Sequence, residues 1–174
     1  MHKLTEIENQ PLLWSQSKDD KRVWELMAGE ALVGSLAWQN PTADGTRATV
    51  TSADGQWTFK RVGAFVPRMT VRIAGQETDL ATMNTQAARH HLKFADGRKL
   101  YFARPDFWSH SFVFTQTDGT PLLTFKRNGT RVELSSAGAK YPDASLLALF
   151  GCYLLHLYAR DAEAGALLGV IASL

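Results

Sequence analysis

The sequence predicts a mainly β protein, an antiparallel β-barrel of about twelve strands that encloses a hydrophobic C-terminal helix. Asp-Gly turns recur between short segments of alternating polarity. Near the C-terminus, the run from Leu146 to Ala159 carries no charged side chain. The composition, 45% hydrophobic and 21% charged, is ordinary for a globular protein of 174 residues. We therefore expect one domain over residues 1–174.

Turn signals divide the first three quarters of the chain into strands. Asp-Gly and Asn-Gly pairs are strong hairpin signals because tight turns need positive φ. They occur at Ala43–Gly45, Ala53–Gly55, Ala95–Gly97, Thr117–Gly119 and Asn128–Gly129. Between them polarity alternates, as in Met69, Val71 and Ile73 against Thr70 and Arg72, which indicates one buried face. The predicted strands are 23–28, 31–39, 46–52, 56–62, 68–74, 77–82, 88–94, 98–104, 110–117, 120–127 and 130–135, with another near 12–15.

A helix is predicted over about 143–160, where Asp143 is a good N-cap and Arg160 and Asp161 end the apolar run. A helix that is apolar on all sides lies in a membrane or is surrounded by protein. A membrane span needs about 20 apolar residues, and this run is shorter. A barrel of about twelve strands is too wide to be filled by its own side chains, so the helix fills it. Residues 164–174 form a second helix, a strand or a flap; Gly165 and Gly169 disfavour a long regular helix there.

Two hairpins resemble each other. Thr51–Gly63 and Thr115–Gly129 both contain Asp-Gly, then Thr-Phe-Lys-Arg, then a glycine two residues later. The likeness reflects either recurring hairpin chemistry or two related half-sheets.

The stretches Gly97–Gly129 and Leu147–Asp161 resemble the tubby C-terminal domain and its wider group, which includes plant LURP-one-related proteins and phospholipid scramblases. The chain looks like a small bacterial member of that group. The resemblance implies a barrel around a hydrophobic helix and head-group binding by basic residues of the barrel, without assigning particular positions. The cysteine-rich and calcium-binding segments of the scramblases have no match here, so scrambling is not expected.

The repeated hairpins supply candidate lipid-binding residues. Lys60 and Arg61 correspond to Lys126 and Arg127, and Arg131 follows closely. If the two halves meet, these residues form a cationic patch for phosphate head groups. The alternative is a solvated barrel face on which basic residues protect sheet edges. The formal net charge of +2 is only a weak excess. Binding of nucleic acid would be expected to need a clustered basic stripe, so nucleic acid is not an expected partner.

The densest aromatic stretch, Arg104–Phe112, contains Phe107, Trp108 and His110. These residues could anchor the protein at a membrane interface or line a pocket at the barrel mouth. Alternatively, they plug the barrel end over the helix.

No common catalytic motif is present: there is no Walker loop, G-x-S-x-G, H-E-x-x-H or cysteine pair. Cys152 and His156 lie at i and i+4 on the helix, but two ligands do not make a metal site. We interpret them as a buried thiol and a core histidine with one hydrogen-bond partner. His90 and His91 point to opposite faces of a strand and are interpreted as surface residues. No metal, cofactor or enzymatic activity is expected.

The sequence therefore favours a non-enzymatic domain that binds an anionic phospholipid or a partner protein. One alternative is a small-molecule carrier or enzyme with a pocket near Phe107–His110; another is a structural module without a ligand. The N-terminus lacks a signal-peptide pattern, which favours a cytoplasmic protein, peripheral to the membrane where it binds lipid. No transmembrane segment is expected, and the sequence does not fix the oligomeric state.

Overall fold

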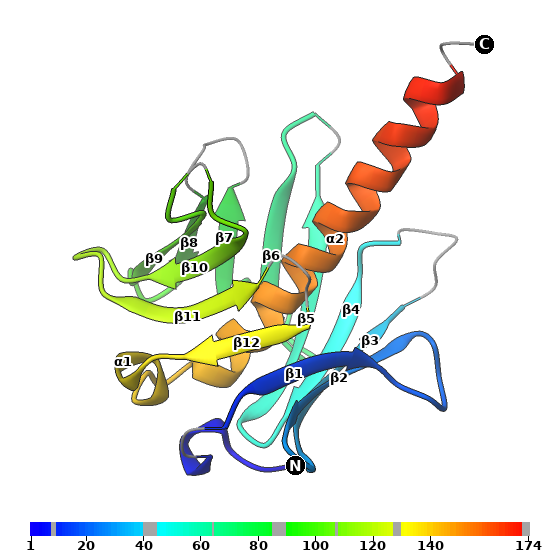
Figure 1. Ribbon diagram of the computed structural model, residues 1–174. Helices are drawn as coiled ribbons and strands as arrows, with labels where there is room; N and C mark the ends of the chain where they lie inside the picture. Colours follow the sequence, from blue (N-terminus) through cyan, green and yellow to red (C-terminus); the bar gives the residue numbers. More distant parts are fainter. Residues whose placement is uncertain are drawn as a thin grey trace.

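In the computed structural model, twelve antiparallel strands form a closed barrel around a long C-terminal helix (Figure 1). The structure describes residues 1–7, 10–39, 45–63, 65–84, 90–106, 108–126 and 130–171. The strands are β1 (Leu12–Gln16), β2 (Val23–Ala28), β3 (Ala31–Trp38), β4 (Ala48–Ser52), β5 (Gly55–Val62), β6 (Arg68–Ile73), β7 (Ala81–Asn84), β8 (His90–Phe94), β9 (Lys99–Ala103), β10 (Ser111–Thr115), β11 (Pro121–Lys126) and β12 (Arg131–Leu134). The helical elements are η1 (Leu4–Glu6), α1 (Ser136–Ala139) and α2 (Ala144–Ile171).

Each strand pairs with its sequence neighbours, and β1 pairs with β12 to close the barrel. The predicted fold class is therefore confirmed. One strand is displaced from its predicted range of 77–82, because β7 begins only at Ala81. The residues before it form a turn in which Glu77 and Asp79 accept bonds from Arg72. At the same turn Ile73 is 39% exposed, although its alternation predicted a core position.

The first part of α2 fills the barrel. Every residue from Ala144 to Leu154 is buried, so protein surrounds the whole circumference of the helix. Phe59 of β5 packs edge-on against Phe150 and Tyr153, with ring centroids 5.1 and 5.5 Å away. Burying a side chain of this size contributes roughly 1.5–3 kcal/mol each. The helix thus fills the interior space that the side chains of this wide barrel cannot fill by themselves.

Glycines allow the helix to approach the wall closely. A Cβ on Gly151 would overlap the ring of Phe125 in β11. On the other side, a Cβ on Gly34 of β3 would lie 2.8 Å from Cδ1 of Leu149. The absence of a side chain at these two positions lets α2 lie close to both β11 and β3.

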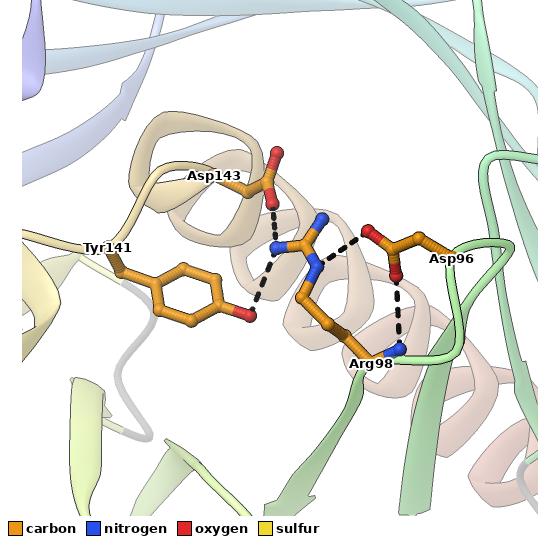
Figure 2. Close-up of polar contacts among 4 residues, drawn as sticks. All are labelled: Asp96, Arg98, Tyr141 and Asp143. Carbon is orange, nitrogen blue, oxygen red and sulfur yellow. Dashed lines mark hydrogen bonds and ion pairs between the residues drawn. The ribbon is translucent and has the colours of Figure 1, made fainter.

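A polar cluster fixes the start of α2 (Figure 2). Arg98, in the turn between β8 and β9, donates to Asp143 at 2.6 Å, to Asp96 at 2.7 Å and to the Tyr141 hydroxyl at 3.3 Å. Desolvation opposes the charge of Arg98, but the bonds to Asp143 and Asp96 outweigh it and raise the pKa of the guanidinium. Ser145 adds a bond of 2.5 Å to Asp54 in the β4–β5 turn. We call this end of the barrel the base.

The helix is longer than predicted, because it continues past Arg160 and Asp161 to Ile171. Its 28 residues correspond to a length of about 42 Å. Burial ends near Leu157, and residues 159–164 are exposed, so α2 protrudes from the barrel (Figure 1). Among the described residues, no helix combines the length and the apolar character that crossing a membrane requires.

Candidate functional site: the exit end of the barrel

We call the end from which α2 protrudes the exit end. In an up-and-down barrel the connections after β1, β3, β5, β7, β9 and β11 all lie at one end. Contacts with the helix identify that end: Arg61 donates to Asp161 at 2.6 Å, and the Tyr153 hydroxyl donates to the Thr46 carbonyl at 2.6 Å. Arg160 reaches the Gly45 carbonyl. These contacts join Tyr153, Arg160 and Asp161 of α2 to strand ends remote from the base.

Large apolar side chains stand in solvent at the exit end. Phe65 is 98% exposed and Val66 55% exposed in the β5–β6 loop, and Trp108 is 83% exposed in the β9–β10 loop. The β5–β6 loop starts at Gly63, whose φ of 91° favours glycine and whose added Cβ would lie 2.6 Å from the Val66 carbonyl oxygen. A tight turn therefore holds Phe65 away from the barrel.

The structure places Trp108 and His110 of the predicted aromatic stretch on the surface. They do not plug the barrel end, and Phe107 lies outside the described residues. The loop position of Trp108 agrees with an interface anchor.

The basic residues of the two repeated hairpins do not form one patch on the wall. Lys60 and Arg61 lie on β5, and Lys126 lies on β11, with five strands between β5 and β11 in either direction. Because β5 and β11 both run toward the exit end, these residues nevertheless lie near the same rim. Arg127 falls outside the described residues.

Most of these predicted cations have an acidic neighbour. Glu133 lies 3.4 Å from the ammonium of Lys126 and 3.2 Å from the guanidinium of Arg131. Arg61 is paired with Asp161. The rim carries further basic residues, which the sequence analysis did not assign to it: Arg22, Arg47, Arg68, Arg104 and Arg160.

The base has the opposite character. Each of its strand connections carries an acidic residue: Glu30, Asp54, Glu77, Asp79, Asp96 and Asp118. Asp96 and Asp118 each accept a bond from a main-chain N–H two residues later. These bonds lower the pKa of both carboxyls, which stay ionised at neutral pH. The exit end also carries acidic residues, namely Asp19, Asp20, Asp106, Asp161 and Glu163, but basic residues outnumber them there among the described residues. The barrel is therefore polarised, with an excess of basic residues at the exit end and acidic turns at the base.

The interior near the exit end holds two histidines. His156 lies between Trp24 and Trp38, with ring centroids 5.1 and 4.9 Å away. Burial, reinforced by the charge of Arg160, lowers its pKa. The predicted hydrogen-bond partner is not found in the described part of the chain; two indole rings surround the imidazole instead. Sequence spacing could not reveal this cluster because β2 and β3 supply its tryptophans.

His90 faces inward, with its ring 6.0 Å from that of Tyr158. The surface interpretation of His90 was therefore wrong, whereas His91 is exposed on the opposite face as predicted. Cys152 is buried as predicted, and burial raises the pKa of its thiol. Over the described residues, no three histidine, cysteine or acidic side chains are grouped closely enough to hold a metal ion.

Comparison with known proteins gives no match to a family model, a curated protein or a solved structure.

Proposed function

We propose that the protein is a non-enzymatic, tubby-like binding domain that docks on anionic membranes through its exit end. The observation that carries the proposal is the exposure of Phe65 (98%) and Trp108 (83%) on separate loops of the basic end of the barrel. Aromatic side chains enter the head-group region of a bilayer, while basic residues around them contact lipid phosphates.

The protruding part of α2 supports the same orientation. After Glu163 its sequence to Ile171 is Ala-Gly-Ala-Leu-Leu-Gly-Val-Ile, without a charge. Since this segment leaves the barrel at the exit end, a membrane there would receive it together with the two loops. An uncharged segment of this kind suits insertion to the head-group boundary.

The charge polarity of the barrel adds an orienting force. An anionic surface attracts the basic rim and repels the acidic turns of the base. Attraction of about 1 kcal/mol for each basic residue near the surface is enough to orient the molecule before any side chain inserts.

Cosedimentation with vesicles tests the proposal. We expect binding to vesicles that contain phosphatidylserine, weak binding to phosphatidylcholine alone, and a fall in binding as salt rises. The double variant Lys60→Gln/Arg61→Gln should lose at least about tenfold in affinity. The matched control Lys93→Gln/Lys99→Gln removes the same charge from exposed residues toward the base and should bind nearly as the natural protein does.

The apolar contribution has its own pair of variants. Phe65→Ser/Trp108→Ser should weaken binding, including at high salt, whereas Ile73→Ser, which removes an exposed apolar side chain at the base, should not. Equal effects of the exit-end and base variants would refute docking through the exit end.

A further inference from the structure

A hollow of about 660 Å³ lies beside the seam that closes the barrel. One flank comes from the N-terminal segment and β1, and the other from β12 and the following α1. It is lined by Leu4, Ile7, Gln10, Pro11, Leu12, Arg131, Glu133, Leu134, Ser135, Ser136, Ala139 and Lys140. We call it the seam groove. Its volume falls in the range of about 300–1,000 Å³ that is usual for small-molecule sites.

The groove exists because the seam is short. Over the described residues, β1 and β12 pair through Leu12↔Val132 and Leu13↔Arg131, with one further bond from the Trp14 N–H to the Thr130 carbonyl, whereas β1 pairs with β2 along its whole length. The last residue of β12, Leu134, therefore extends beyond the start of β1. There α1 turns away: Ser135 caps it by accepting from the N–H of Gly138, and that glycine packs against the Leu122 carbonyl. The diverging segments leave an open channel with fixed walls.

The groove combines an apolar lining with a positive rim. Ile7, Leu134 and Ala139, which are all half-buried, supply its apolar surface. Both oxygens of Glu133 are engaged, by Arg131 at 3.2 Å and by Lys126 at 3.4 Å. Lys140 is exposed at the end of α1 and has no carboxylate partner among the described residues. The cations at the groove thus exceed the acidic charge that faces them.

We propose that the seam groove binds a small monocarboxylate with a single apolar chain. The chain would lie along Ile7, Leu134 and Ala139, and the carboxylate would be held by Lys140, while Arg131 is a second cation of the lining. A cation of the same shape would be repelled by these residues, and a neutral alcohol would leave Lys140 without a partner. The inference does not rest on the proposed function, because much of the groove adjoins the base end of the seam.

Titration calorimetry with decanoate, below its micelle concentration and without vesicles, tests the site on the full chain. We expect saturable one-to-one binding, with decyltrimethylammonium and decanol weaker. Lys140→Gln should weaken decanoate binding about fivefold, while the matched control Lys99→Gln, an exposed lysine on β9, leaves it unchanged. Ala139→Trp should fill the groove and abolish binding.

Absence of decanoate binding, equal binding of decyltrimethylammonium, or equal loss in Lys140→Gln and Lys99→Gln would overturn the proposal. If Ala139→Trp does not fold, the comparison of Lys140→Gln with Lys99→Gln still tests the proposal. The double variant Phe65→Ser/Trp108→Ser should bind decanoate normally, so failure of membrane docking and failure of this site are distinguishable.

Discussion

The guanidinium of Arg61 and the carboxylate of Asp161 lie 2.6 Å apart and join the rim of β5 to α2 where the helix leaves the barrel. The side chain of Arg61 is 30% exposed and that of Asp161 is 51% exposed, so solvent reaches the pair. A lipid phosphate approaching the exit end would therefore compete with Asp161 for Arg61. The contact holds the helix against the rim and limits the charge available to a membrane.

Asp161→Asn should strengthen binding to anionic vesicles by roughly fivefold, because it removes a negative charge and releases Arg61. The control Glu163→Gln makes the same charge change on the same exposed part of the helix. Its gain should be smaller, since Glu163 has no ion-pair partner among the described residues. Vesicle cosedimentation at fixed salt compares the two, and equal gains would show that release of Arg61 contributes nothing.

Gly151→Ala should destabilise the protein although alanine is the better helix former. The added methyl group overlaps the Phe125 ring, and overpacking of this kind costs about 1–3 kcal/mol. Denaturant unfolding measures the loss. Phe125→Leu in the same chain should recover part of it, because the smaller side chain leaves space for the methyl group. Strictly additive losses in the double variant would contradict the contact.

His156 should make stability depend on pH. Its pKa is lowered in the folded protein by burial and by Arg160, while Glu163 acts in the opposite direction. The unfolded chain therefore binds the proton more readily, so this contribution is complete above about pH 6.5 and is lost as the pH falls below it.

In His156→Phe, the free energy of unfolding should decrease less between pH 7.5 and pH 5 than it does in the natural protein. His110→Gln, at an exposed histidine in the β9–β10 loop, should leave the fall unchanged. His90 contributes in the same direction, because burial lowers its pKa as well. A slope that is identical in His156→Phe and in the natural protein would rule out His156 as a source.

Arg98→Met should lower the free energy of unfolding by about 1–2 kcal/mol, because it leaves Asp143 and Asp96 without their donor. The Arg98 side chain is 38% exposed, which keeps the loss moderate. Arg22→Met breaks a comparable pair with Asp20 in which the arginine side chain is 67% exposed, and its effect on stability should be much smaller than that of Arg98→Met. Equal losses would contradict the anchoring role of the Arg98 cluster.

The barrel and its central helix could be predicted because both depend on local signals: Asp-Gly turns, alternating strands and an apolar run. Even β1, predicted only near 12–15, occupies Leu12–Gln16. The predictions failed where contacts between residues that are not adjacent in the sequence determine the bounds of an element. Arg72 holds Glu77 and Asp79 in a turn, which delays β7. Two helix residues, Asp161 and Arg160, contact Arg61 and the Gly45 carbonyl of the barrel, and these contacts accompany the continuation of the helix past its predicted end.

The candidate site was only partly predictable for the same reason. The repeat linked Lys60 with Lys126, but barrel closure places β5 and β11 on opposite walls. Trp108 was identified because it lies in an aromatic stretch of the sequence. Phe65 has no aromatic neighbour in its short loop, so no sequence pattern pointed to it. Which residues share an end depends on the direction of every strand, and this became clear only once the barrel was complete.

The orientation of the protein on a vesicle tests the central proposal most directly. An environment-sensitive fluorophore would be attached at Phe65→Cys on the exit end or at Thr117→Cys in the exposed β10–β11 turn of the base. Cys152 is buried and should not react with the label. With phosphatidylserine vesicles, docking through the exit end predicts a blue shift and protection from aqueous quenchers at position 65, and no change at position 117. A shift at 117 alone, or at neither position, would contradict it.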